Sequence, residues 1–381
     1  MPKTEVPWRE ASSLIIAARI TLQELVGSNL GKALSSSVKR ISRSDYHLLM
    51  VKRSNVSSYF ANAYVFPGGL VEVDDFSPKW WGVFEQAGVS RLELEAFSSR
   101  VTGPRPPMIT DSVTAARARA RDDNQDILPP DLAYRIAAIR ETFEETGVLL
   151  VTSPIKNAKK PVIGHVPEWQ KQIHGNSLSF IELCLQHQAC PDVWSLMEWW
   201  DWLTPTSVGH RRYDTMFYVC CMDRQPPVVL DNNEVVTMKW YTPQEILEEH
   251  ASQNMFMAPP QVYELSRLAG ATSFQALRQH ASRREKFGVE RWLPVLATCR
   301  DGALSLLPGD PLYPRNPDYL GKQPGPDYPH TLEELRVRGA NRLNRMEIRG
   351  PIIGVHCSCE PTCGHVRPTT MRPATIVQSY L

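Results

Sequence analysis

The sequence predicts an α/β fold, because apolar runs typical of strands alternate with one strongly periodic helical segment. Residues 12–19 form one such run, and 213–221 form a longer one typical of a buried strand. Residues 131–146 have helical periodicity, with Asp131 as the expected N-cap and Gly147 where a helix ends in a left-handed residue. This mixed order of strands and helices suits an α/β sandwich.

The remaining elements are expected on both sides of that helix. Strands are expected at 46–53, 64–66, 148–151, 200–205 and 234–241, and helices from Thr242 and as a pair across 260–286. Segments 76–130 and 153–195 read as two large insertions. The sequence therefore predicts a domain over 10–250, a helical extension over 251–320, and a Pro/Arg-rich, loosely ordered tail over 321–381.

Composition and charge narrow the class of protein. The 381 residues suffice for one large or two smaller domains, and a net charge of +1 argues against extended nucleic-acid binding. No apolar run approaches the roughly eighteen residues that span a bilayer, and the run at 12–18 is too short and badly placed for a signal peptide. The eight scattered cysteines suit a reducing compartment.

The chemistry is concentrated on the helix at 131–146. At about 100° per residue, Glu141, Glu144 and Glu145 cluster on one side of it, flanked by Arg140. The opposite side is an apolar stripe of Leu132, Ile136, Ile139 and Phe143. Three carboxylates on one face repel one another unless a cation gathers them, and Mg²⁺ takes such oxygen ligands. The alternative is an ordinary solvated helix face.

A second feature favours the metal site over the solvated face. The apolar extended segment 63–66 leads into a turn at Gly68-Gly69. Paired glycines let the backbone approach a ligand closely, so a carbonyl there could add a neutral oxygen to the metal.

Together the turn and the helix resemble the signature of the Nudix hydrolases. The helix half of that signature matches at Arg140, Glu141, Glu144, Glu145, Gly147 and Val148. Two positions depart from it: Asp75 stands where Glu is expected, and 64 residues (76–139) separate it from Arg140 where the family has seven. The resemblance implies a Nudix α/β/α sandwich with a mixed sheet, here with two large insertions and the C-terminal helical extension.

The resemblance also implies roles for these residues. It implies hydrolysis of a diphosphate with Mg²⁺ or Mn²⁺ as cofactor, Glu141 and Glu145 being the primary metal ligands. Glu144 would be a further ligand or the base for the attacking water, and Arg140 would hold the glutamates in place. The carbonyl of Gly68 or Gly69 completes the expected shell. Glu234 is a candidate for one more acidic residue, or an ordinary exposed glutamate at a strand start.

Over residues 10–320 the chain is similar to the peroxisomal acyl-coenzyme A diphosphatase branch of the Nudix hydrolases. The similar segments are 190–196, 202–205, 211–215, 290–294 and 306–310. That branch also has a split signature. The similarity implies coenzyme A and acyl-coenzyme A as substrates, cleaved to adenosine 3′,5′-bisphosphate and (acyl-)4′-phosphopantetheine.

A coenzyme A site needs cations near the 3′-phosphate. Arg211-Arg212 and Lys52-Arg53 are the candidate pairs, although a solvated strand end would look the same. Ser58 and Asn62 stand near positions where many bacterial coenzyme A diphosphatases have Arg and Gly, so that signature gives no support. Two other functions remain open: a Nudix hydrolase of another nucleoside diphosphate-linked substrate or of capped RNA ends, and a non-catalytic Nudix binding module.

Two features of the C-terminal tail allow alternative interpretations. The residues His356, Cys357, Cys359, Cys363 and His365 could bind zinc, but their irregular spacing favours a metal-free tail. The last residues, Ser379-Tyr380-Leu381, partly match the C-terminal tripeptide read by a peroxisomal import receptor. We expect a peroxisomal location, with mitochondrion and cytosol as alternatives; Glu5, Glu10 and Glu24 argue against a mitochondrial transit peptide.

Overall fold

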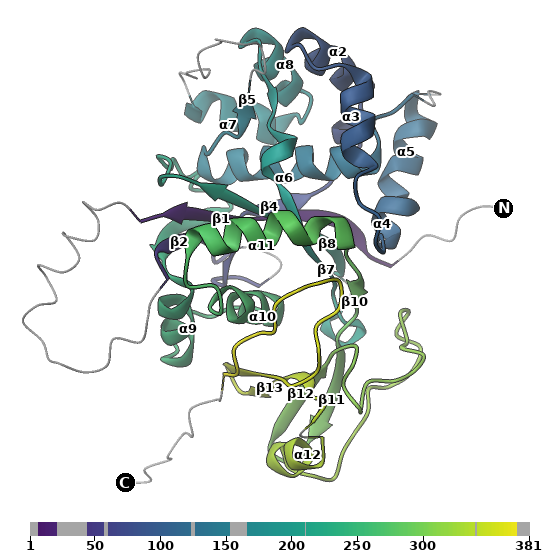
Figure 1. Cartoon of the computed structure of the whole chain (residues 1–381), viewed down its shortest axis with the longest axis vertical. Helices are drawn as coiled ribbons and strands as arrows, with labels where there is room; N and C mark the ends of the chain where they lie inside the picture. Colours follow the sequence, from purple (N-terminus) through teal and green to yellow (C-terminus); the bar gives the residue numbers. More distant parts are fainter. Residues whose placement is uncertain are drawn as a thin grey trace, which may run out of the picture.

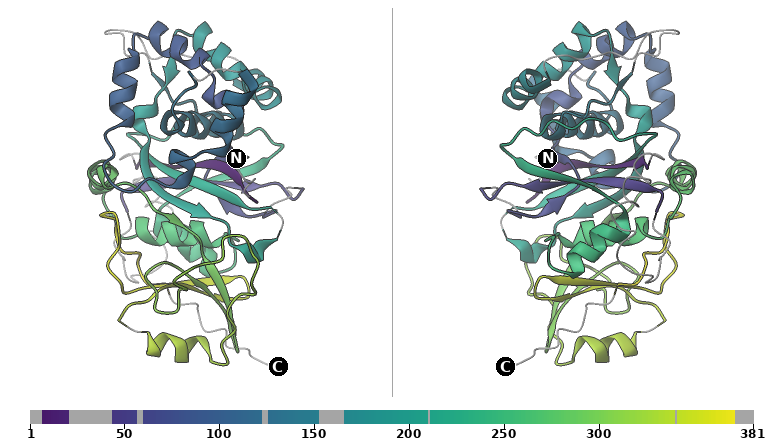
Figure 2. Two further views of the ribbon diagram at one scale, coloured as in Figure 1. Left: turned by 90° about the vertical axis from the view of Figure 1, so that its right-hand side faces the viewer. Right: turned by 90° about the vertical axis from the view of Figure 1, so that its left-hand side faces the viewer.

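The computed structural model of the chain describes residues 7–20, 44–56, 60–122, 126–152, 166–209, 211–339 and 341–371. Figure 1 shows a central sheet with helices above and below it and a second, smaller sheet further down, near the C-terminal end of the chain. The two side views in Figure 2 show the same layers from the edges of the central sheet. The fold is the α/β sandwich that the sequence predicts.

The central sheet is mixed, as expected. Its strands run in the order β10-β7-β8-β1-β2-β3, with β4 paired to β1 and β9 paired to β2. β1 is parallel to β8 and antiparallel to β2, and β7 is antiparallel to β8. The strands are β1 (Arg9–Arg19), β2 (Tyr46–Arg53), β3 (Tyr64–Val65), β4 (Gly68–Leu70), β7 (Met197–Leu203), β8 (Tyr213–Met222), β9 (Val235–Tyr241) and β10 (Arg291–Trp292).

Helices cover both faces of this sheet (Figure 1). Helix α6 (Pro130–Thr146) lies directly on one face, packed against β1 and β4. Outside α6 lie helices from the two insertions: α2 (Lys79–Gln86), α3 (Arg91–Ser98), α4 (Pro107–Thr110), α5 (Val113–Asp122), α7 (Val166–Gly175) and α8 (Ser179–Gln186). The short strands β5 (Val151–Thr152) and β6 (Cys190–Pro191) pair with each other beside them. The opposite face carries α9 (Pro243–Ala251), α10 (Pro259–Leu268) and α11 (Phe274–Arg284).

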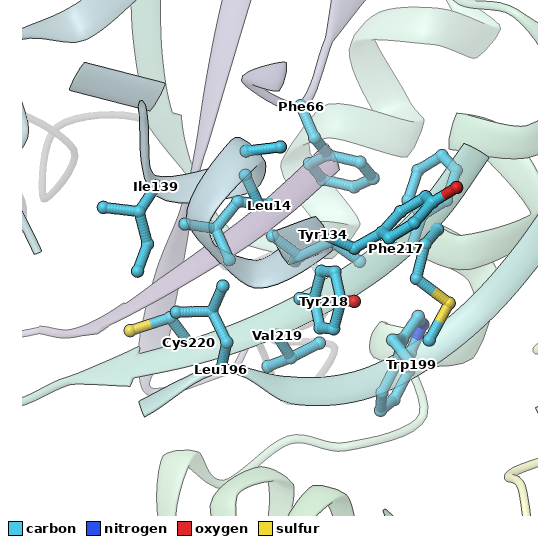
Figure 3. Packing of buried hydrophobic residues seen from close by; sticks show 14 of the residues in the cluster. Leu14, Phe66, Tyr134, Ile139, Leu196, Trp199, Phe217, Tyr218, Val219 and Cys220 are labelled. Atoms are coloured by element: carbon cyan, nitrogen blue, oxygen red, sulfur yellow. The ribbon is translucent and has the colours of Figure 1, made fainter. Parts of the chain in front are cut away.

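Helix α6 is buried on every side. Its apolar stripe packs into the main core; Figure 3 shows Ile139 of the helix beside Leu14 of strand β1. Gly147 ends the helix with φ of 66°, as predicted. The expected N-cap at Asp131 was wrong: the N-cap is Pro129, two residues earlier, and the helix begins at Pro130, because a proline in the first turn needs no N–H partner. Asp131 instead accepts a hydrogen bond from Arg135.

The predicted C-terminal helical extension was also wrong. Beyond α11 the chain forms an antiparallel sheet of β11 (Val295–Cys299), β12 (Gly302–Leu306), β13 (Asn344–Arg349) and β14 (Ile352–Cys357), with α12 (Leu332–Arg338) on one face. Two of these strands lie in the region predicted to be a loosely ordered tail. Strands β12 and β13 pair across almost forty intervening residues (307–343), so the pairing that stabilises them is non-local.

The smaller sheet is attached by side chains to the helices that cover one face of the larger sheet. The hydroxyl of Tyr263 in α10 donates to Asn344 Oδ1 at 2.7 Å, and the Ile353 N–H donates to His250 Nε2 at 3.3 Å. Met346 and Val355 extend the main core into this sheet. No helix in the described ranges is long and apolar enough to cross a membrane.

Candidate active site

The Gly68-Gly69 turn and the carboxylates of α6 lie against each other, although 71 residues (70–140) separate Gly69 from Glu141. The Gly68 N–H donates to Glu145 Oε2 at 3.0 Å. A Cβ on Gly69 would lie 2.3 Å from Glu141 Oε2, and a Cβ on Gly68 would lie 2.3 Å from the Ser12 carbonyl oxygen. The turn is therefore restricted to glycine by close approach on two sides, to the helix and to strand β1.

Arg140 organises the acidic cluster. Its Nε and Nη2 donate to the two oxygens of Asp75 at 2.9 and 3.0 Å, and Nη2 also donates to the Leu70 carbonyl at 2.9 Å. Its Nη1 donates to Glu141 Oε1 at 2.9 Å and to Glu144 Oε1 at 2.6 Å. The arginine thus connects the segment after the Gly-Gly turn to two carboxylates of α6.

Asp75 replaces the expected Glu without leaving a gap in this network. It lies in a 3₁₀ turn (Val73–Phe76), where its Oδ2 also accepts the Glu72 N–H at 2.8 Å. This turn brings the shorter side chain up to the guanidinium, so the carboxylate still makes a bidentate pair with Arg140.

Burial dominates the electrostatics of the cluster. Burial, reinforced by the charge of Glu144 and opposed by Arg140, raises the pKa of Glu141 to about 8. Burial and the neighbouring charge of Glu141 also raise the pKa of Glu145 well above its ordinary value, although the Gly68 N–H acts in the opposite direction. The ionised forms of these two carboxyl groups are therefore unfavourable unless additional positive charge is bound next to them.

A cavity of about 890 Å³ opens beside the cluster. Gly68, Gly69, Glu141 and Glu144 line it, whereas Glu145, only 2 % exposed, lies behind its wall. Among the described residues, no group of three or more His, Cys, Asp or Glu side chains is already arranged around a metal position. The site offers carboxylate and carbonyl oxygens, the donor type that hard divalent cations take.

Two further candidate residues from the sequence also line the cavity. Arg53, at the end of β2, and Glu234, just before β9, both lie on its wall. Their charges reach the carboxylates: Arg53 lowers and Glu234 raises the pKa of Glu145. Strands β2 and β9 pair at this point, which brings together two residues far apart in the sequence.

The other basic residues predicted to bind the 3′-phosphate, Lys52, Arg211 and Arg212, do not line the cavity. Arg212 is buried and donates to the carbonyl oxygens of Thr204 at 2.9 Å and Tyr319 at 2.7 Å. Arg211 is exposed, and the Lys52 ammonium lies 5.9 Å from the centre of the Tyr64 ring. Lys52 and Arg53 differ because successive side chains of a strand point to opposite faces.

His174 is a cavity residue that the sequence did not single out. It comes from insertion helix α7, and its Nδ1 lies 3.6 Å from Glu144 Oε2. A single half-exposed histidine in an amphipathic helix carries no motif, so only the folded arrangement identifies it.

The His/Cys residues of the C-terminal region have separate surroundings. His365 packs edge-on against Trp199 with ring centroids 4.3 Å apart, and His356 lies 3.5 Å from Glu347. Cys357 and Cys359 approach each other with sulfurs 3.8 Å apart. These five residues are not among any metal-binding group in the described part of the chain.

Comparison with known proteins agrees with the Nudix signature at the Gly-Gly turn and helix α6. The chain matches the family described as the NUDT19 Nudix domain over residues 8–268 and the NUDT19 C-terminal domain over residues 296–357. The acyl-coenzyme A diphosphatase NUDT19 of Xenopus laevis is 36 % identical, covering 96 % of both chains. That of Gallus gallus is 39 % identical over 83 % of this chain and 82 % of its own, and that of Homo sapiens 33 % identical over 95 % and 94 %.

Among solved structures, a Nudix hydrolase from Alicyclobacillus acidocaldarius covers 70 % of this chain and 93 % of its own, with 19 % identity and a TM-score of 0.46. The family matches extend over both sheets, and they include the turn and the helix that form the acidic cluster. The chain belongs to the NUDT19 family of Nudix proteins.

Proposed function

We propose that this protein hydrolyses the diphosphate of coenzyme A and acyl-coenzyme A, giving adenosine 3′,5′-bisphosphate and (acyl-)4′-phosphopantetheine. The observation that carries the proposal is the acidic cluster at the cavity wall, assembled by Arg140 from both halves of the Nudix signature. The relatives named acyl-coenzyme A diphosphatase support the choice of substrate, since they match this chain over nearly its whole length.

The residues fit a divalent cation, Mg²⁺ or Mn²⁺. Glu141 and Glu145 are buried carboxylates whose raised pKa values indicate too little positive charge around them. Gly69 has no Cβ, and this leaves its backbone next to the Glu141 carboxylate. When bound, such an ion would neutralise phosphate charge and make water a better nucleophile.

Each residue then has a defined task. Glu141 and Glu145 hold the cation, with the carbonyl of Gly68 or Gly69 as a neutral oxygen. Glu144, at the cavity wall, accepts the proton of the attacking water or adds a further ligand oxygen. Arg140 positions Glu141 and Glu144 through its hydrogen bonds, and Glu234, also on the cavity wall, contributes further negative charge that raises the pKa of Glu141.

For the 3′-phosphate of the substrate we propose Arg53 in place of Arg211 or Arg212. Arg53 lines the cavity on the same side as Phe60, whose ring packs near Phe256 with centroids 6.3 Å apart. A guanidinium in a cavity that is also lined by a partly exposed phenylalanine, Phe60, suits a phosphorylated nucleoside, since the phosphate pairs with the cation and the base can stack.

The proposal is tested by comparing substrates in the presence of Mg²⁺. Coenzyme A, ADP-ribose, NADH, diadenosine polyphosphates and capped RNA are incubated with the wild-type protein and with Glu145→Gln. We expect coenzyme A and its thioesters to be cleaved with the highest kcat/KM and to release adenosine 3′,5′-bisphosphate. A higher kcat/KM for another compound in the panel, or equal turnover by Glu145→Gln, would contradict the proposal.

Peroxisomal location also remains a proposal. Ser379, Tyr380 and Leu381 lie outside the described residues, so the support is the tripeptide itself. A fluorescent protein fused to the N-terminus should give punctate fluorescence that overlaps a peroxisomal marker, and deleting the last three residues should make it diffuse. Diffuse or mitochondrial fluorescence from the intact fusion would exclude this address.

A further inference from the structure

The cavity is built by both parts of the chain. Four of its lining residues, Pro294, Leu296, Ser305 and Ile348, come from the smaller sheet or the segment leading into it. We call these four residues the C-terminal wall. The cavity therefore combines this wall with an acidic cluster that belongs wholly to the Nudix domain.

The register of the smaller sheet explains which side chains form this wall. Leu296 pairs with Ser305, and Ala303 pairs with Ile348, so Leu296, Ser305 and Ile348 share one face of the sheet. Residues in the alternate positions, such as Leu304 and Leu306, point to the other face and pack with α12. The first face packs against the main core through Met346 and Val355, and it reaches the cavity at Leu296, Ser305 and Ile348.

The chemistry of the cavity differs between its two sides. Arg53, Arg140 and the acidic residues lie on the side of the Nudix signature. Among the described lining residues, those from 202 to 217 and from 258 to 348 are all uncharged. Helix α10 begins there with Pro259 and Pro260, which have no N–H to offer an anion. This side suits a neutral or apolar group and not a phosphate.

The uncharged lining also includes polar groups. Gln261 and Thr215 line the cavity, and Gln261 Oε1 has no hydrogen-bond partner within the described chain although the residue is only 9 % exposed. A buried amide oxygen without a partner is uncommon in folded proteins. Because this oxygen is buried, the Gln261 side chain must rotate toward the cavity before the oxygen can accept a hydrogen bond from an amide group of a ligand.

We propose that the C-terminal wall binds the acyl chain of acyl-coenzyme A, with the amide-containing pantetheine arm passing Gln261 and the adenosine bisphosphate lying near Arg53. This inference rests on the proposed function and adds where the chain-length preference is determined. The reverse orientation would place the 3′-phosphate on an uncharged surface and the acyl chain among charged groups, which is unfavourable on both counts. The smaller sheet is then part of the substrate site.

The test measures binding separately from turnover. A series of S-alkyl coenzyme A thioethers, from methyl to dodecyl, is titrated into the wild-type protein in EDTA by calorimetry. Each methylene that enters the wall should tighten binding by about fourfold, the change expected for one buried CH₂ group. Hydrolysis of coenzyme A itself is measured in parallel with Mg²⁺.

Substitutions at Leu296 test whether the dependence of binding on chain length arises at the C-terminal wall. Leu296→Trp should weaken binding of the dodecyl thioether at least tenfold while changing that of coenzyme A less than twofold. Leu296→Gln, which keeps the volume, should weaken the dodecyl thioether in the same selective way and covers the case that the tryptophan variant does not fold. Val337→Trp is the matched control, because Val337 lies on α12 and is 72 % exposed. It should leave the whole series unchanged.

The outcomes separate the two proposals. Binding that does not tighten with chain length, or Leu296 variants that weaken coenzyme A as much as the dodecyl thioether, would overturn the assignment of the wall. If binding follows the expected pattern but coenzyme A is not cleaved, the proposed function is wrong and the wall assignment stands. If coenzyme A is cleaved without length-dependent binding, only the wall assignment is wrong.

Discussion

Arg140 has no N–H group left for a substrate. A guanidinium has five donors, and the five hydrogen bonds to Asp75, Glu141, Glu144 and the Leu70 carbonyl use all of them. The residue therefore acts through its neighbours, as a positioning residue. Its planar fork also explains why a lysine cannot replace it, since an ammonium offers three donors and no bidentate pair.

Arg140→Lys should consequently lower activity by about 10–100-fold, the range seen when residues behind metal ligands are changed. The loss should be larger at limiting Mg²⁺ than at saturating Mg²⁺, because the carboxylates are no longer held in place. Titration of kcat against metal concentration measures this. A purely structural role predicts the same fractional loss at every metal concentration.

Glu141→Gln and Glu145→Gln should each lower turnover by at least two orders of magnitude. A glutamine keeps the volume but removes the charge that a divalent cation needs. Burial raises the pKa of both carboxyls, so the ionised form is unfavourable, and neutral amides in their place should leave the metal-free variants no less stable than the wild type at pH 7. Thermal unfolding in EDTA and turnover in Mg²⁺ test the two effects; unfolding at a much lower temperature would attribute the lost activity to the fold.

Arg53→Ala should raise the KM for coenzyme A about tenfold or more and change that for dephospho-coenzyme A little. Losing one charge-assisted hydrogen bond to phosphate costs about 1.5–3 kcal/mol. Arg211→Ala, at an exposed position off the cavity wall, is the control and should leave both KM values unchanged. An equal rise in KM for both substrates would show that Arg53 does not bind the 3′-phosphate.

The difference between Arg53 and Arg212 shows what sequence could and could not supply at this scale. The acidic cluster was predictable because Arg140, Glu141, Glu144 and Glu145 are close in sequence and one helix determines their directions. Arg212 looked equally suitable as a phosphate ligand, yet its guanidinium is used by the carbonyls of Thr204 and Tyr319. Tyr319 is over a hundred residues away, so no local pattern reveals that contact.

At the scale of single elements, helix α6 was predicted correctly from its local sequence, but its burial was not. Its charge-rich face is covered by the insertion helices, which is why Glu144 is only 8 % exposed. The smaller sheet is the opposite case. Its strands of five or six residues carry little periodicity of their own, and pairing between β12 and β13 forms only once the intervening chain has closed.

Strands β7 and β8 carry a second pair of buried carboxyls, at Asp201 and Asp214. Burial raises the pKa of Asp214 to about 6, while Arg291 at 3.0 Å opposes the shift. Burial and the adjacent Asp214 raise the pKa of Asp201 well above its ordinary value. The folded protein therefore holds protons that the unfolded chain, with Asp near 3.9, has released. This contribution to stability is complete below about pH 4 and is lost as the pH rises through about 6.

Asp201→Asn should accordingly stabilise the protein at pH 7.5, by about 2–3 kcal/mol, and have almost no effect at pH 3.5, where the aspartate is protonated in both the folded and the unfolded chain. The amide keeps the shape of the protonated acid and removes the ionisation that is unfavourable at neutral pH. Urea unfolding at the two pH values gives the comparison. An equal change at both would show that Asp201 does not titrate in this range.

At the scale of the whole molecule, one buried ionic network joins segments that are far apart in the sequence. Arg135 of α6 is fully buried and donates to Asp131, to Glu198 at 3.3 Å and to Glu285 at 3.0 Å. Arg105, from the first insertion, donates to Asp131 and Glu198 at 2.6 Å each. The network connects the first insertion, α6, strand β7 and the turn after α11, so the insertion is bound into the domain.

Arg135→Met should destabilise the protein by about 3–5 kcal/mol, because three carboxylates lose a shared partner in a region from which water is excluded. Adding Glu198→Gln should restore part of that loss, since burial already raises the pKa of Glu198 to about 7 and a neutral amide removes one of the uncompensated charges.

The surface pair of Arg91 and Asp126 provides the control: Arg91→Met should leave the urea midpoint nearly unchanged, because both side chains are about half exposed. If Arg135→Met also left the midpoint unchanged, the network would be a consequence of the fold and not one of its supports. A loss of cooperativity, with the first insertion unfolding before the central sheet, would identify the network as the connection that makes the two unfold together.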